Sequence, residues 1–367
     1  MDPLDFSQHF HIKQGFCYPD WDAISRIIER DLPELERNRA WEDVSRGWVK
    51  LIRDQLEGDY NIHETANFLI LSEAPMRVIR DACKSYEDSL KRILAGLEGV
   101  ASDEGYGKHV VLMFANLDDY YRYIAYFYPD GESPMSGGVC LSGDGYVHFA
   151  FPTVDYSSYR TVLVHELTHG CLGHLPLPAW LNEALAMRME QVVCESDIFH
   201  LDKEVYRKHA AHWDEETIQE FWTGDSWGIP GDSFELSYNL AQVIWRKIEG
   251  DLRAPRTEIL RFILNAHYAD AGETACQAVF DLSLGDLVTD FLGDGNWTPQ
   301  PTKRPVKLRQ GTPEVDGVNL KIRDVTLRIM VPSDVPILRA IYQTNAPEFL
   351  PDDSSIVEED INEDSPN

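Results

Sequence analysis

The sequence contains little positive charge. Lys and Arg together number 33 in a chain of 367 residues, against 62 Asp and Glu, so the formal net charge is −29. Nucleic acids and anionic membrane surfaces are bound through basic patches, whose Lys and Arg side chains neutralise phosphate groups. The charge balance therefore argues against nucleic acid and against a membrane surface as partners.

Paired cysteine motifs and long apolar runs are also missing. The six cysteines include no CxxC pair, which excludes a zinc knuckle and a thioredoxin-like motif. The first 16 residues lack the basic stretch and apolar run of a secretory signal. No apolar run approaches the roughly 18 residues that a membrane span needs. We therefore expect a cytoplasmic protein whose cysteines are reduced and mostly buried.

Hydrophobic residues are plentiful, and their spacing predicts the secondary structure. They make up 43% of the chain, and aromatic residues 11%, which is enough for a buried core in about two domains. Apolar residues recur at helical spacing over 20–57, 76–98 and 117–128, whereas 67–72 and 109–115 are short apolar runs typical of strands. Two alternating segments flank Ser142-Gly-Asp-Gly145, a pattern that predicts a β-hairpin.

The second half of the chain is dominated by helical periodicity, which extends from Tyr159 to about residue 293. Residues 298–314 are rich in Pro, Lys and Arg and suggest a linker, 318–331 alternate like a strand, and the chain is acidic from Glu348 onward. Strands first and helices afterwards predict an α+β protein with a small mixed sheet. The expected parts are an N-terminal helical region (1–62), a main domain (63–295), a linker and C-terminal strand region (296–347), and an acidic, disordered tail (348–367).

The motif that carries chemistry is His165-Glu166-Leu-Thr-His169, an HExxH sequence inside a helical pattern. Residues four apart lie on one face of a helix, so the two imidazoles can bind the same Zn²⁺ ion. Glu166 lies next to the first histidine, where it can take a proton from a metal-activated water. The alternative is a helix in which the two histidines bind no metal.

A catalytic zinc site needs a third protein ligand. The metzincin pattern fails, because Leu172 and Leu175 occupy its glycine and histidine positions and His174 misses the ligand position by one. No GTxxxD sequence of the aspzincin kind follows either. Glu183, in Pro178-Ala-Trp-Leu-Asn-Glu183, begins a following helix and offers the third ligand. An N-terminal glutamate that merely favours the helix dipole is the alternative.

HELTH followed closely by LPAWLNEALA resembles the gluzincins, zinc metallopeptidases with HExxH and a downstream glutamate, and in particular the peptidase MA-like domains. The resemblance covers about residues 65–295 and is specific over 161–187. It implies a zincin-like main domain, Zn²⁺ bound by His165, His169 and Glu183, and Glu166 as the general base. The implied substrate is a peptide or protein.

Three positions depart from the family pattern. Met187 stands where an acid commonly hydrogen-bonds a zinc-bound histidine, and Glu190, one turn further on, is a possible replacement. Phe234 stands where a tyrosine commonly stabilises the oxyanion, and Tyr238, also one turn on, is the candidate substitute. Ala184 in place of glycine is a mild change, because alanine favours a helix.

Two further expectations concern the other histidines and the hairpin. Residues 145–151 are expected to form the sheet edge to which a substrate peptide adds as a strand, with His148 able to reach the cleft. His209 and His212 have a spacing of three but lack a nearby carboxylate pattern, so an ordinary helix surface is the simpler interpretation. The leading hypothesis is a zinc peptidase. The alternatives are a weakened peptidase-like domain that binds zinc and a peptide or protein partner, and a structural metal site.

Overall fold

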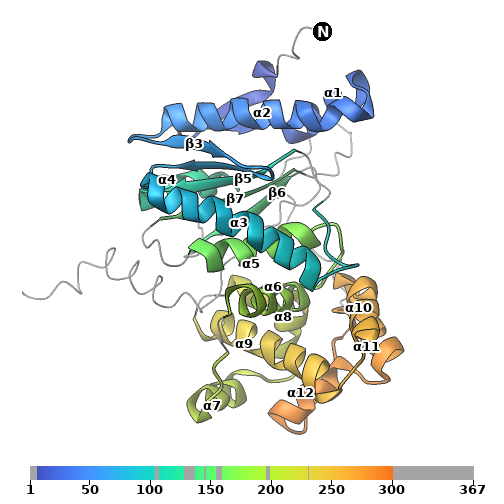
Figure 1. The fold of residues 1–367 in the computed structure, drawn as a ribbon. Coiled ribbons are helices and arrows are strands. Elements are labelled where there is room, and N and C mark those ends of the chain that lie inside the picture. The colour runs from blue at the N-terminus through green and yellow to red at the C-terminus, as the bar shows by residue number, and fades with distance from the viewer. Residues whose placement is uncertain are drawn as a thin grey trace, which may run out of the picture.

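The computed structural model describes residues 6–103, 107–127, 137–143, 146–153, 159–195, 199–229 and 231–300. Helices and strands both contribute to it, and a mixed sheet lies between layers of helices (Figure 1). The predicted α+β class is therefore confirmed. The predicted linker from 301 on, the strand at 318–331 and the acidic tail fall outside the described residues. No helix of the described part is both long and apolar enough to cross a membrane.

The main sheet has five strands in the order β3-β4-β5-β7-β6. Strands β4, β5 and β7 are parallel, and β3 and β6 join them antiparallel at the two sides. Because helices cover both faces, the central strands are apolar on both sides, as is usual for parallel strands. The bounds are β3 Asn61–Glu64, β4 Phe68–Ser72, β5 His109–Phe114, β6 Val139–Gly143 and β7 Tyr146–Pro152.

The strand expected at the edge of the sheet lies inside it. β7 pairs with β5 on one side and with β6 on the other, so the prediction that residues 145–151 form an edge is wrong. Among the strands of the described residues, β6 is the outer one on that side. A hairpin signal identifies two neighbouring strands but does not say which of them meets the rest of the sheet, and here the second strand does.

One face of the sheet is covered by the N-terminal segments. They comprise β1 (Phe10–Lys13), β2 (Phe16–Pro19), α1 (Trp21–Asp31), α2 (Glu34–Gln55) and α4 (Leu117–Ile124). The predicted helices of 20–57 and 117–128 are thus present. The β1–β2 hairpin and β3 were not expected, and the boundary placed at residue 62 falls within β3.

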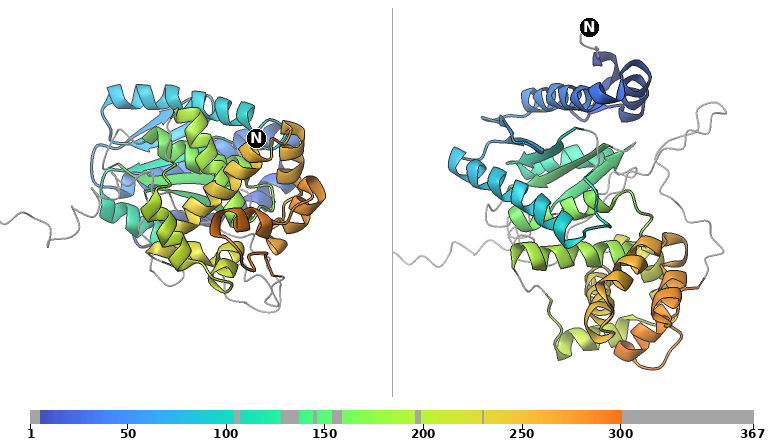
Figure 2. Two further views of the ribbon diagram at one scale, coloured as in Figure 1. Left: turned by 90° about the horizontal axis from the view of Figure 1, so that it is seen from below. Right: turned by 45° about the vertical axis from the view of Figure 1, so that its right-hand side comes forward.

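The other face is covered by α3 (Met76–Gly96) and α5 (Tyr159–Leu172), with α6 (Ala179–Cys194) beneath α5 and α9 (Asp232–Arg246) packed against α6 (Figure 2). The predicted long helical region is confirmed. Its remaining helices are α7 (Lys203–His212), α8 (Thr217–Thr223), α10 (Arg256–Asn265), α11 (Glu273–Phe280) and α12 (Leu284–Leu292). Short helical turns occur at Ser7–His9, Ala125–Phe127, Asp225–Gly228, Lys247–Asp251 and Tyr268–Asp270.

Candidate metal centre

Helix α5 carries the HExxH motif and is buried between the sheet and α6. Every residue from Val162 to His169 is buried, which fits a helix whose apolar residues occur all round its circumference. Gly170 continues the helix, and a Cβ at this position would come within 3.1 Å of Phe149 and 3.4 Å of Val147 on β7. The glycine therefore allows α5 to approach the sheet closely, and the helix ends at Leu172, just before Gly173.

Helix α6 brings the third candidate ligand. Pro178 is its N-cap, as a residue that fixes φ and lacks an N–H can be, and Glu183 lies just past the first turn. The indole Nε1 of Trp180 donates to the carbonyl of Ala271 at 2.9 Å, which ties the start of α6 to the C-terminal helices. Packing of α6 across α5 then directs Glu183 toward the two histidines.

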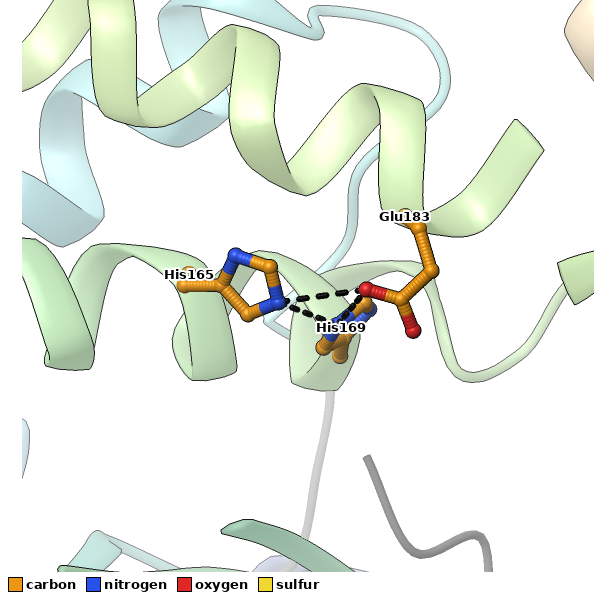
Figure 3. A group of neighbouring side chains, drawn as sticks. All are labelled: His165, His169 and Glu183. Atoms are coloured by element: carbon orange, nitrogen blue, oxygen red, sulfur yellow. Dashed lines mark hydrogen bonds and ion pairs between the residues drawn. The ribbon is translucent and has the colours of Figure 1, made fainter. Parts of the chain in front are cut away.

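The three predicted ligands meet at one point (Figure 3). Nε2 of His165 and Nε2 of His169 are 3.1 Å apart, and Oε2 of Glu183 lies 3.2 Å from the first and 3.4 Å from the second. All three side chains are buried. The geometric requirement on which the zinc hypothesis depends is thus met by residues from two helices.

The outer nitrogens of both imidazoles are held by other side chains. Nδ1 of His165 lies 2.5 Å from Oε1 of Glu190, and Nδ1 of His169 lies 2.6 Å from Oδ1 of Asn182. A carboxylate or amide oxygen accepts a hydrogen bond, so each Nδ1 is the protonated donor and each Nε2 carries a lone pair. Two lone pairs and a carboxylate oxygen therefore face one another, an arrangement that calls for a cation.

The spacing of these atoms fits a zinc ion. Ligand atoms about 2.0–2.1 Å from a tetrahedral metal are separated by about 3.3 Å, which matches the three separations above. Two imidazole nitrogens and one carboxylate oxygen are also a ligand set that zinc accepts. Within the described residues only these three side chains form such a group, which would leave the fourth position open, as in a catalytic rather than a structural site.

The electrostatics of the group favour the same interpretation. Burial alone would lower the pKa of His165, but the carboxylates of Glu183 and Glu190 outweigh it and raise this pKa well above its ordinary value. Burial opposes ionisation of Glu183, yet His169 and His165 hold its pKa well below the usual range. Positive charge is thus strongly favoured at this point, and a metal ion would compete with a proton for it.

The predicted general base follows the predicted ligand His165 on α5. Glu166 is fully buried, and its charge contributes to the raised pKa of His165. Its assignment as the base stays a prediction.

Tyr238, the candidate for stabilising the oxyanion, is buried on α9, which packs against α6. Its ring meets Trp227 and Phe234 edge-on, with ring centroids 6.0 and 5.1 Å apart. These contacts indicate a packing role for the ring. A role for its hydroxyl in catalysis stays a prediction.

The other predicted histidines lie away from this centre. His174 is exposed in the turn after α5. The expectation that His148 reaches the cleft is wrong, because its side chain lies among the aromatic residues of the N-terminal layer, where Nε2 lies 2.7 Å from the Tyr123 hydroxyl. His209 is buried rather than exposed, and Trp213 and Asn239 hydrogen-bond its two nitrogens.

Asn182 is the residue near the centre that the sequence did not assign. The sequence pattern places it only in the helix start that precedes Glu183, whereas in the structure its Oδ1 contacts His169 across from α6 to α5. The contact of Asn182 with His169 could be predicted only from the way in which α6 packs on α5. Glu190 was named as a possible replacement for the acid missing at Met187, and its contact with His165 confirms that it reaches the histidine.

Comparison with protein-family models gives no match for this chain, and comparison with curated proteins gives none either. The resemblance to the gluzincins therefore depends on the motif and on the geometry described above.

Proposed function

We propose that this protein is a zinc-dependent metallopeptidase of the gluzincin type. The observation that carries the proposal is the convergence of His165, His169 and Glu183 at mutual separations of 3.1–3.4 Å. Glu166 follows His165 directly in the sequence. The buried contacts of Glu190 and Asn182 add support, because such partners fix the orientation and basicity of histidine ligands.

Each residue of the site has a separate role in the proposed hydrolysis. When bound, a zinc ion would supply a Lewis acid that polarises the peptide carbonyl and lowers the pKa of water. Glu166 would accept the proton of the attacking water and pass it to the leaving amine nitrogen. His165, His169 and Glu183 would hold the metal, while Glu190 and Asn182 keep the two imidazoles in the required tautomer.

Substrate would bind along β6 rather than β7, because β6 is the outer strand on the side of the sheet that α5 contacts. An extended peptide can add to such an edge through backbone hydrogen bonds. The proposed substrate is accordingly a peptide or protein segment in extended form. A cytoplasmic location is part of the proposal, supported by six cysteines that are all free.

A second candidate function is zinc-dependent binding of a peptide or protein partner without efficient turnover. Phe234 favours it, because an apolar ring cannot donate to an oxyanion. Met187 stands where the family pattern has an acid, which by itself would favour the second function too, but Glu190 contacts His165 instead.

Cleavage of a mixed peptide library separates the two functions. The peptidase predicts cleavage that a chelator abolishes and added zinc restores. Binding of library peptides with no cleavage, by protein that carries zinc, would favour the second function.

A further inference from the structure

A groove lies on the side of the sheet opposite to β6, between the outer edge of β3 and helix α3. Its volume is about 590 Å³. The strand side is formed by residues 62–65, and the helix side includes Met76, Arg80 and Lys84. β3 pairs only with β4 among the strands of the described residues, so its outer edge is unpaired there. This groove is separate from the candidate metal centre.

The backbone of β3 presents hydrogen-bonding groups to this groove. The N–H of Thr65 donates to the carbonyl of Phe68, and the register pairs His63 with Ile70. In an antiparallel ladder, hydrogen-bonded residues alternate with residues whose N–H and C=O point outward. Ile62 and Glu64 are the outward-facing residues, so two donors and two acceptors line the free edge.

Two basic side chains of the groove are not paired with acids. Arg80 and Lys84 are exposed, and neither side chain forms an ion pair or hydrogen bond within the described residues. The two acids that line the groove contact other side chains: Glu64 is bound by Arg46 and Lys108, and Glu87 by the neutral side chains of Thr65 and Asn67. Glu87 keeps its negative charge in the groove, but Arg80 and Lys84 together outweigh it. In a chain of net charge −29, these two unpaired cations are a local exception.

One further feature suits a peptide. Met76 is 53% exposed and gives the groove an apolar contact surface.

We propose that this groove binds an extended acidic peptide segment of another protein, which adds as a strand to β3 and places carboxylates beside Arg80 and Lys84. A second copy of this chain fits less well. Pairing β3 with its symmetry mate would put both α3 helices on the same face of a continuous sheet. The Arg80 and Lys84 side chains of the two copies would then repel each other, as would two net charges of −29.

A displayed library of random ten-residue peptides, selected on the full chain, tests the proposal. Selected sequences are expected to be enriched in Asp and Glu alternating with β-branched residues. The double variant Arg80→Glu/Lys84→Glu should weaken binding of a selected peptide at least tenfold. Lys203→Glu/Arg207→Glu on α7, with the same change in charge at exposed positions, should leave binding unchanged.

Strand addition is tested separately from charge attraction. Ile62→Pro removes an outward N–H that the β3–β4 ladder does not use, so it should abolish binding, whereas Ile62→Val should preserve it. The far-ultraviolet circular dichroism spectra of both variants check that the fold is retained. If Ile62→Pro fails to fold, hydrogen exchange on the wild type replaces it, because strand addition should protect the amides of Ile62 and Glu64.

Three outcomes would overturn the proposal. The first is a selection that shows no acidic enrichment. The second is peptide binding without protection of these two amides. The third is a wild-type dimer in sedimentation that Ile62→Pro converts to a monomer, which would assign the β3 edge to a second copy.

Discussion

Nδ1 of His165 and Oε1 of Glu190 lie 2.5 Å apart in a buried contact between α5 and α6. Glu190 is seven residues after Glu183, two helical turns along the same face, and Met187 occupies the position one turn along. Glu190 thus reaches His165 from two turns along α6, whereas the position one turn along holds the apolar Met187. The contact leads to the first prediction.

Glu190→Ala should lower the affinity for zinc by about 10- to 100-fold, because loss of an outer-shell partner frees the imidazole to rotate and reduces its basicity. Glu190→Gln should lose less, since its amide oxygen still accepts a hydrogen bond. Competition with a chelating dye measures both values. Glu195→Ala is the control, since Glu195 is exposed and its recorded partner is Arg92. Equal affinities in all four proteins would show that Glu190 does not support the metal.

Zinc content should depend on the three converging side chains. Purified protein is expected to carry about one zinc ion per chain, and His165→Ala or Glu183→Ala should lose it. The control is His174→Ala, which removes an exposed histidine of the same segment and should leave the metal in place. Elemental analysis by mass spectrometry gives the answer. Wild-type protein that binds no zinc, even after the ion is added back, would contradict the metal assignment.

Glu166→Gln should separate metal binding from hydrolysis. The amide is close in size to the carboxylate but cannot take a proton, so zinc content should be unchanged while peptide cleavage falls roughly 100-fold or more. Chelator-sensitive cleavage and zinc content are measured on the same preparation. Unchanged cleavage in this variant would exclude Glu166 as the base.

Lowering the pH should reduce the stability of the fold, because the buried side chain of His209 resists protonation. Burial lowers its folded-state pKa to about 4, against an ordinary value near 6.5, and Trp213 donates to its Nδ1. Because the unfolded chain binds the proton more readily, the neutral histidine contributes stability above about pH 6.5, and this is lost as pH falls toward 4. The full contribution is about 3 kcal/mol.

Urea denaturation between pH 4 and 7.5 tests this coupling. His209→Gln should be less stable at pH 7.5, and its free energy of unfolding should change less with pH than that of the wild type. His174→Gln, at an exposed position, should keep the wild-type slope. Parallel slopes for all three proteins would rule out His209 as the source.

Local patterns in the sequence account for most of the helices and for part of the metal centre. The spacing of His165 and His169 follows from the helix alone, and the long amphipathic segments predicted α2 and α3 without any tertiary information. Short elements were harder to predict. β3 has only four residues, too few for a clear periodicity.

The β1–β2 hairpin could not be predicted from the sequence for a different reason. All four residues of β2 are buried, so this strand lacks the alternation that identifies half-buried strands. Its turn has positive φ at Gln14 and Gly15, and Gln is a weaker signal in this position than Asn or Asp.

The remaining features depend on contacts between distant parts of the chain. The position of β7 inside the sheet is set by its pairing with β5, which no hairpin pattern reveals. The contacts of Asn182 and Glu190 with the two histidines require α6 to cross α5 at one particular place. Sequence spacing places residues within a helix, but the relative placement of two helices comes from their packing.

The burial of α5 has a consequence for how this protein can change over evolutionary time. From Val162 to His169 the helix has no solvent-facing side, since all of these residues are buried and α5 packs against the sheet, α3 and α6. Substitutions that would be neutral on the exposed side of a surface helix must here fit among tightly packed side chains. Few residue types should therefore be tolerated even at Val162 and Leu163, which are buried but are not among the predicted ligands.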